Sequence, residues 1–398
     1  MTPAVMAAVT KLLQIHFAGL TLPIRKSLGL VTLGFLHLLA SVRGGQGTLT
    51  LSALVRALPL PHSFHSRENR LRRLLNNRRV DSRAVSSGLA SLILGGRRGV
   101  CPVLVDQTKS GATQALVAAV PYVGRALPLS VFTFDYPLRE RSVKSQNQLE
   151  HLFLLNLEQS LPEGVTPVWI GDQGYARAML FRQCETEGRL YIIRGRKGTG
   201  IAWNGTRRKL HQLKCNAYRA ARYEDVMYHS TRRVRADVVA YWEPEFQEPW
   251  WLVVSPALRE RTTPEQVVAL YRERMQIEQS FRDFKTHLGL RGLRLLVDVA
   301  ERTGRLLVLF MLAYAMAVIL GDSDLAQEAR ALLECPRRSA RHGTRATLSA
   351  LTIARLILSD PVWAPRAEAA LLAILRRALR RSPLLPASAL LVCPKNPP

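Results

Sequence analysis

The pattern of apolar and polar residues divides the 398-residue chain into three parts. Residues 1–95 have the apolar spacing of helices, and residues 323–398 again favour helix as far as about residue 380. Between these parts, from about residue 98, short β-branched and apolar runs are separated by Gly and Pro, which is typical of strands. We therefore expect an N-terminal helical domain, a central α/β region and a C-terminal helical region.

The central region predicts a mixed sheet with helices on its faces. Three strand-like runs come first: VCPVLVDQT, QALVAAVPYV and LPLSVFTFDY. A helix at 147–161, the strand TPVWIGDQG, a second helix and the strand RLYIIRGR at 189–196 follow in that order. Three strands and two helix–strand units predict an α/β layer with a mixed five-stranded sheet.

Residues 197–255 break this rhythm with the short strand-like pieces KLHQLK, RADVVAYW and PWWLVVSP, so we expect an inserted β subdomain. Residues 96–196 and 256–322 would then form one core around the insertion. A long helix is predicted at 262–287, because TTPEQVV offers Thr caps and a Pro near the first turn.

Charge narrows the choice of partner. The chain has 56 Lys and Arg against 30 Asp and Glu, a formal charge of +26, and it is 47% hydrophobic, which argues against general disorder. Such a charge attracts polyanions across about one Debye length, ~8 Å at physiological salt. Nucleic acid is the expected partner, and an anionic membrane surface is the alternative.

Membrane insertion, secretion and disulfide bonding are not expected. The apolar run at 306–320 is shorter than the ~20 residues that span a bilayer, and we interpret it as a buried helix. The N-terminus lacks a basic leader before an uninterrupted apolar stretch. The five cysteines have no CxxC spacing, which favours a reducing compartment and no zinc site. We expect a soluble cytoplasmic protein.

The segment HSRENRLRRLLNNRRV at 65–80 is amphipathic and strongly basic. Leu71, Leu74 and Leu75 have the i, i+3, i+4 spacing of a buried helix face. The remaining positions carry six arginines: Arg67, Arg70, Arg72, Arg73, Arg78 and Arg79. Contact with phosphate groups is the preferred interpretation, and a solvated basic face is the alternative.

Two aspartates follow buried strands. Asp106 ends the apolar run VCPVLVD, and Asp172 ends VWIGD. The carboxyl edge of an α/β sheet is where ligands usually bind. A single such Asp is more often a turn or helix cap, but two at equivalent positions favour a site.

The long predicted helix supplies a third acid. At ~100° of rotation per residue, one narrow face carries Tyr271, Arg274, Glu278 and Lys285. Glu273 and Asp283 do not share that face. Glu278 is therefore the predicted functional acid of the helix, against the alternative of a solvated charge run.

Three carboxylates at one sheet edge require a cation, because two unit charges 4 Å apart repel by ~4 kcal/mol at an effective dielectric of 20. Hard oxygen ligands without His or Cys suit Mg²⁺ or Mn²⁺. Two such ions can activate a water or a 3′-hydroxyl for phosphodiester exchange. A basic protein with this site predicts phosphoryl transfer on DNA or RNA.

These residues resemble a known family. Tyr271, Arg274, Glu278 and Lys285 match the pattern Y-x2-R-x3-E-x6-K of IS4-type DDE transposases, to which the Tn5 and Tn10 enzymes are related. VDQT at Asp106 and DQGYAR at Asp172 are similar to the motifs of the first and second family aspartates. The resemblance covers about residues 45–320.

The resemblance implies an RNase H-like core in which Asp106, Asp172 and Glu278 hold two Mg²⁺ ions, for which Mn²⁺ can substitute. It implies cleavage at the ends of a bacterial insertion sequence and joining of the 3′ ends to target DNA. Relatives pass through a DNA hairpin. The N-terminal helices would recognise the terminal inverted repeats, and the synaptic complex implies a homodimer on DNA.

Further DNA contacts are implied for several residues. The counterparts of Tyr271, Arg274 and Lys285 grip a terminal phosphate and a flipped base. Trp250 or Trp251 would receive that base, although burial of both in a strand is equally compatible. Arg194 is placed like a family arginine that approaches DNA, with a plain surface arginine as the alternative.

Three other hypotheses stay open. A related nuclease would hydrolyse DNA without strand transfer, and an inactive transposase derivative would only bind DNA. A basic protein of the membrane surface would bind liposomes in the presence of competitor DNA.

Overall fold

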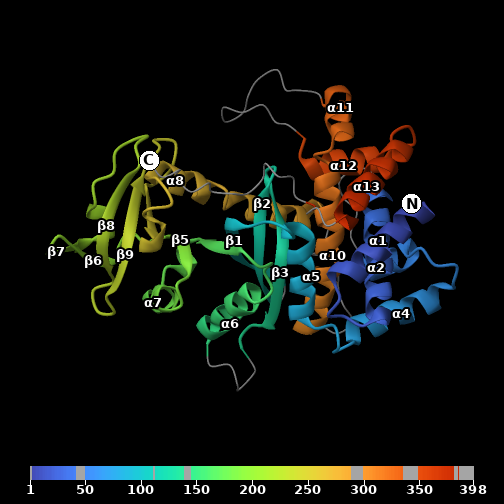
Figure 1. Ribbon diagram of the computed structural model, residues 1–398, viewed down its shortest axis with the longest axis horizontal. Helices are drawn as coiled ribbons and strands as arrows, with labels where there is room; N and C mark the ends of the chain where they lie inside the picture. The colour runs from blue at the N-terminus through green and yellow to red at the C-terminus, as the bar shows by residue number, and fades with distance from the viewer. Residues whose placement is uncertain are drawn as a thin grey trace.

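The computed structural model describes residues 2–41, 50–110, 113–138, 145–287, 299–334, 348–380 and 384. A long mixed sheet crosses the molecule, with a group of helices packed at one end of it (Figure 1). The domain boundaries expected above remain predictions. Apart from Leu384, the chain beyond residue 380 lies outside the described residues.

The N-terminal part is helical, as predicted. It comprises α1 (Pro3–His16), α2 (Leu22–Ser41), α3 (Leu51–Ala57), α4 (Phe64–Asn76) and α5 (Ser82–Leu94). The three leucines predicted on the apolar face of the basic helix α4 are buried. The helix ends at residue 76 and not at 80, because the Asn77 side chain accepts a hydrogen bond from the backbone N–H of Arg79 and stabilises a turn.

The predicted meander and the two helix–strand units are present. β1 (Gly99–Ser110), β2 (Thr113–Tyr122) and β3 (Arg125–Asp135) are antiparallel, and β4 (Val165–Gly171) and β5 (Leu190–Arg194) run parallel to β1. The strand order β3-β2-β1-β4-β5 is consistent with an RNase H-like fold. The intervening helices are α6 (Gln146–Glu158) and α7 (Ala178–Thr186).

The sheet does not stop at five strands. The insertion contributes β6 (Gly200–Trp203), β7 (Thr206–Lys209), β8 (Ala221–Tyr228), β9 (Val234–Tyr241) and β10 (Trp250–Val254). β10 pairs antiparallel with β5, with Leu252 opposite Arg194, so the described sheet is continuous over ten strands.

One predicted strand of the insertion is wrong. KLHQLK contains a short 3₁₀ turn at Leu210–Gln212 in place of a strand. Its two leucines, Leu210 and Leu213, are both buried, and their spacing of three residues suits a helical turn better than the alternation of a strand.

The long helix predicted at 262–287 is divided. It consists of α8 (Pro264–Arg272), α9 (Met275–Arg282) and a π-helical turn at Asp283–His287. Its start is as predicted, since Thr263 and Gln266 form a reciprocal capping box before Pro264. At the junction, Arg274 N donates to Tyr271 O at 3.0 Å, and Ile277 N donates to Arg274 O at 3.2 Å. These i→i−3 hydrogen bonds tighten the chain locally.

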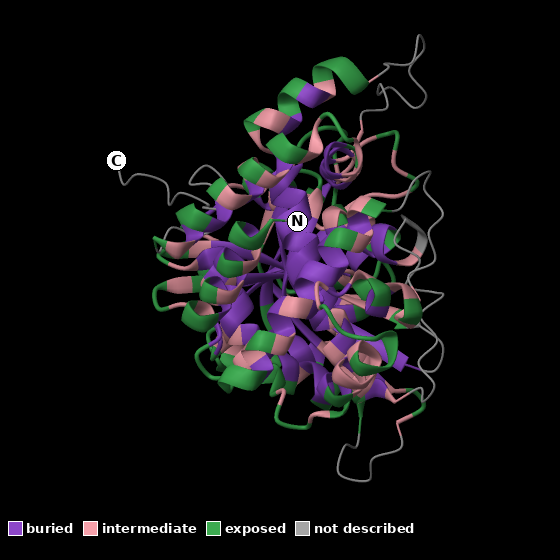
Figure 2. Ribbon diagram, turned by 90° about the vertical axis from the view of Figure 1, so that its right-hand side faces the viewer, coloured by how far each residue is buried: buried purple, intermediate pink, exposed green. Residues whose placement is uncertain are grey.

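The C-terminal part is helical, with α10 (Ala300–Leu320), α11 (Asp324–Leu333), α12 (Ala350–Ser359) and α13 (Ala364–Leu379). By length and composition, α2 and α10 could each cross a membrane. In α10, however, 78% of the most apolar window is buried inside the protein, which confirms the predicted core helix. The buried faces of the helices turn inward and their exposed faces outward (Figure 2).

Candidate active site

Asp106 and Asp172 lie at the same level of two neighbouring parallel strands. The register of β1 and β4 pairs Leu104 with Ile170. Asp106 and Asp172 each stand two residues beyond that pair, and side chains two residues apart on a strand share a face. The parallel register therefore places both acids just beyond the last β1–β4 pair. Asp172 follows the end of β4 as predicted, but the prediction that Asp106 lies at the end of its strand is wrong. β1 itself continues past Asp106, to Ser110.

Asp172 also caps the start of a short helix, which is the alternative role that the sequence left open for it. Its Oδ1 accepts a hydrogen bond from Gly174 N at 2.8 Å and starts the short 3₁₀ helix Gln173–Tyr175. A Cβ at Gly174 would lie 2.9 Å from the same oxygen, so a larger residue there would displace the Asp172 carboxylate. Tyr175 is buried beneath the turn, and burial followed by the charges of Asp106 and Asp172 raises the pKa of its hydroxyl well above 10.

Asp106 is largely buried in a negative environment. The pKa of Asp106 is raised to about 6, chiefly by burial; the carboxylates of Asp172 and Glu278 contribute to the rise, and the guanidinium of Arg274 opposes it. The backbone N–H of Gln107 donates to Asp106 Oδ1 at 2.7 Å and also lowers the pKa. The three predicted acids therefore interact electrostatically, as expected of a shared site.

Three side chains hold α9 against the turn between β2 and β3. Gln276 Oε1 accepts from Tyr122 N at 2.8 Å, and Ser280 Oγ accepts from Ala126 N at 2.8 Å. Asp283, which is 1% exposed, accepts from Arg125 Nε at 2.5 Å. The Tyr314 hydroxyl of α10 also donates to Asp283, at 3.0 Å.

The sequence interpretation missed these anchors, although their signal is present. Residues 276, 280 and 283 have the spacing i, i+4, i+7 and lie ~180° around the helix from the predicted face. Their polar contacts turn the opposite face of α9, with Glu278, toward the aspartates. Asp283 was correctly kept apart from the functional face.

Arg274 lies between two of the acids. Its Nη2 donates to Glu278 Oε1, and its Nη1 lies 3.6 Å from Asp106 Oδ2. The guanidinium also faces the ring of Tyr271, 5.9 Å from its centroid. Only 11% of the Arg274 side chain is exposed, and the neighbouring negative groups raise the pKa of its guanidinium although burial, the largest single effect, lowers it.

The three acids have the chemistry of divalent-cation ligands, but in this structure their side chains are too far apart to hold an ion together. Among the described residues, no group of three or more His, Cys, Asp or Glu side chains is close enough to hold a metal ion. Arg274 supplies the positive charge beside Asp106 and Glu278 that a cation would otherwise provide. The hard carboxylate oxygens of the three acids are nevertheless the ligands that Mg²⁺ and Mn²⁺ prefer.

The two tryptophans of β10 have different surroundings. Trp250 is half-buried, stacks on Phe246 at 4.7 Å and meets Tyr271 edge-on at 5.0 Å. Trp251 points to the other face of the strand and is buried, with 6% exposed. The alternative of burial in a strand therefore holds for Trp251, while Trp250 borders the acidic site through Tyr271.

Arg194 and Lys285 lie farther along the same elements. Arg194 ends β5, where its guanidinium donates to Glu248 at 3.1 Å. Burial raises the pKa of the Tyr271 hydroxyl, and the charges of Arg274 and Arg194 oppose that rise. Lys285 is half-buried in the π-helical turn after α9. The wider turn does not continue the 3.6-residue periodicity from which its position on the Glu278 face was predicted.

The four arginines of α4 that were predicted to contact DNA have two kinds of surroundings. Arg67 donates to the backbone carbonyls of His62 and Arg56, and Arg72 forms an ion pair with Glu68 at 2.8 Å. Arg70 and Arg73 instead line a pocket between α4 and α2.

The strand order and the acids at its edge place the protein in the class of mixed α/β proteins whose sheet is consistent with an RNase H-like fold. Residues 129–315 match the family model described as the transposase DDE domain, which supports a DDE transposase. The matched segment contains Asp172 and Glu278 and begins after Asp106.

Two further comparisons complete the picture. No curated protein matches the sequence. Among solved structures, the chain is similar to the cryo-EM structure of a piggyBac transposase synaptic complex with hairpin DNA. That similarity has 10% sequence identity and a TM-score of 0.44, and it covers 98% of this chain and 84% of the other.

Proposed function

We propose that the protein is a DNA transposase of the IS4 type, encoded by a bacterial insertion sequence and acting in the cytoplasm. It would cut DNA at the ends of the element and join the 3′ ends to target DNA. One observation carries the proposal: Arg274 lies between Asp106 of β1 and Glu278 of α9, while Asp172, directly after β4, stands level with Asp106. Three acids from separate elements thus share one electrostatic site.

Asp106, Asp172 and Glu278 would hold two Mg²⁺ ions, with Mn²⁺ as a substitute. Bound in pairs, such ions activate a water or 3′-hydroxyl and stabilise the leaving oxygen of a phosphodiester. The chain's own contribution is positional. The parallel register aligns the two aspartates, and the anchored face of α9 fixes Glu278. Arg274 would leave the acids and turn to a DNA phosphate, for which its planar fork is suited.

The DNA contacts proposed near the site are Tyr271, Arg274, Lys285, Arg194 and Trp250. Tyr271 is 4% exposed and packs against Trp250 and Arg274, so it would reach DNA only if one of them moved. Trp250 is retained as the acceptor of a flipped base because it is half-buried, whereas Trp251 is occupied in the core. Passage through a DNA hairpin and action as a homodimer on paired terminal repeats belong to the same proposal. The helices of residues 1–95 would recognise those repeats.

Supplying a precut element end together with a target plasmid tests the proposal. Joined product in Mg²⁺, lost in Asp172→Ala, is the expected result. Nicking without joining would instead favour an RNase H-like nuclease. Equal strand cleavage by the wild type and Asp172→Ala would favour an inactive DNA-binding derivative.

A further inference from the structure

Helix α4 presents a second polar face beside its buried leucines. Ser66, Arg70, Arg73 and Asn77 follow one another at spacings of four, three and four residues, which places them on one side of the helix. This side faces α2 across a pocket of about 350 Å³. Ser63 caps the start of α4, with its Oγ accepting from Ser66 N at 3.3 Å, and so fixes where this face begins.

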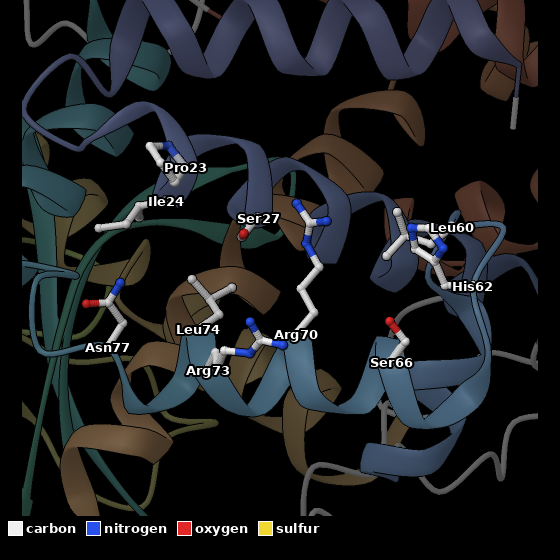
Figure 3. A pocket seen from close by; sticks show the side chains of 10 residues that line it. All are labelled: Pro23, Ile24, Ser27, Leu60, His62, Ser66, Arg70, Arg73, Leu74 and Asn77. Carbon is white, nitrogen blue, oxygen red and sulfur yellow. The ribbon is translucent and has the colours of Figure 1, made fainter.

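The pocket is polar and positively charged. Figure 3 shows Arg70 extending from α4 toward Ser27 of α2, with Arg73 one turn farther along α4. His62 and Ser66 stand at one end of the pocket, and Asn77 lies at the other. Among the described residues that line it, none is acidic, so the two guanidinium groups have no countercharge within the pocket.

The contrast with the other two arginines of α4 is informative. Arg67 is bound to two backbone carbonyls, and Arg72 is bound to Glu68. Within the described part of the chain, neither Arg70 nor Arg73 has a hydrogen-bond or ion-pair partner. Two unpaired guanidinium forks that share a pocket with hydroxyl and amide groups suit an anion with several oxygens.

We propose that this pocket between α2 and α4 binds one phosphate of the DNA backbone, held by both Arg70 and Arg73. The inference rests on the proposed function and deepens it, because it assigns a defined phosphate site to a helix otherwise expected only to be basic. DNA is preferred to a small free phosphate because the whole chain carries a formal charge of +26, which favours an extended polyanion.

Duplex binding by the full chain tests the pocket, with affinity measured by fluorescence anisotropy over a series of salt concentrations. Arg70→Gln, Arg73→Gln and the double variant are compared with Arg67→Gln and Arg72→Gln, which remove the same charge from the same helix. Loss of a charge-assisted contact should weaken binding about tenfold in the pocket variants. The two controls should change affinity less.

The salt dependence separates one shared phosphate from two independent contacts. Each neutralised phosphate contributes a slope of about 0.9 in log affinity against log salt. If both arginines hold one phosphate, the slope of log affinity against log salt should be smaller by about 0.9 in the double variant than in the wild type. Each single variant should lose nearly as much of the slope. A loss of about 1.8 would overturn the shared site, and so would wild-type affinity in the double variant. Thermal melting of each variant excludes misfolding as the cause of weaker binding.

Two further measurements, melting in inorganic phosphate and DNA cleavage, distinguish a DNA phosphate from a small anion and the pocket from the transposase activity. If inorganic phosphate raises the melting temperature of the wild type but not of the double variant, while duplex affinity is equal in both, the pocket serves a small anion and the DNA assignment is overturned. DNA cleavage by the wild type in Mg²⁺ is measured independently. Cleavage with unaltered binding in the double variant overturns the pocket alone, whereas weakened binding without wild-type cleavage overturns the transposase activity alone.

Discussion

The guanidinium of Arg274 lies 3.6 Å from the carboxylate of Asp106, although the two residues come from a helix and a strand far apart in the sequence. The same guanidinium is bound to Glu278 one helical turn away. A divalent cation entering between these acids must therefore compete with a positive charge that already belongs to the protein. This competition yields the first prediction.

Arg274→Gln should increase the stabilisation that Mg²⁺ gives to the folded protein. Without the guanidinium the acids repel one another, and a bound cation then relieves more repulsion than it does in the wild type. In EDTA the variant should be less stable than the wild type, by about 1 to 3 kcal/mol, because charged hydrogen bonds are lost.

The measurement is the melting temperature in EDTA and in saturating Mg²⁺. Arg272→Gln is the matched control, because Arg272 is the neighbouring arginine of α8 and pairs with Glu243 instead. An unchanged Mg²⁺ response in Arg274→Gln would contradict the idea that Arg274 occupies the place of a cation.

Asp106→Asn should stabilise the metal-free protein at pH 8, and about half as much at pH 5. The pKa of Asp106 is raised to about 6 in the folded protein, chiefly by burial, from about 4 in the unfolded chain. The folded state therefore holds its proton more tightly. Its stability falls as the pH rises from 4 through 6, by at most about 3 kcal/mol.

An uncharged Asn removes this loss. Denaturant unfolding in EDTA at the two pH values gives the free energies of unfolding of the wild type and the variant. Asp135→Asn, at the end of β3, is the control. A variant that is equally destabilised at both pH values would contradict the raised pKa.

Asp283→Leu should destabilise the protein by about 3 to 5 kcal/mol, because it leaves the guanidinium of Arg125 without its buried partner. The double variant Asp283→Leu, Arg125→Met should recover much of this loss, since an apolar pair leaves no unpaired charge. Denaturant unfolding of the wild type, both single variants and the double variant gives the coupling energy. Additive losses would show that the two residues do not act as a pair.

Gly174→Ala should reduce DNA cleavage by about 10²-fold and change stability little. The added Cβ would meet Asp172 Oδ1 at 2.9 Å, and the cheapest response is a rotation of that carboxylate. A small displacement of a reacting group costs rates of this order.

The control for this substitution is Gly198→Ala, because a Cβ at Gly198 has nothing within 4 Å. Cleavage rates and melting temperatures of both variants are compared with the wild type. Full activity in Gly174→Ala would argue against a catalytic position for the Asp172 carboxylate.

The sequence could predict those features that depend on local periodicity. Alternation and apolar runs located β1 to β5, and the capping residues located the start of α8. The placement of Asp106 beside Asp172 also followed, because both come after apolar runs and parallel strands bring equivalent positions together. The buried α10 was predicted from its length and composition.

Other features depend on contacts that periodicity does not encode. The pairing of β10 with β5 joins segments separated by the insertion, and no local pattern distinguishes it from a separate subdomain. The tightened turn at Arg274 depends on i→i−3 hydrogen bonds, whereas the prediction assumed a uniform helix. The ion pair of Arg274 with Glu278 fits their spacing, but its approach to Asp106 required the packing of α9 on the β2–β3 turn.

The continuous sheet has a mechanical consequence. β10 carries Trp250 and is hydrogen-bonded to β5, and β5 is hydrogen-bonded to β4, the strand that delivers Asp172. A torque applied to β10 passes through two rows of backbone hydrogen bonds, β10 to β5 and β5 to β4, before it reaches the strand that leads into Asp172. A nucleic acid that twisted β10 would thus shift Asp172 through the hydrogen bonds of the sheet itself.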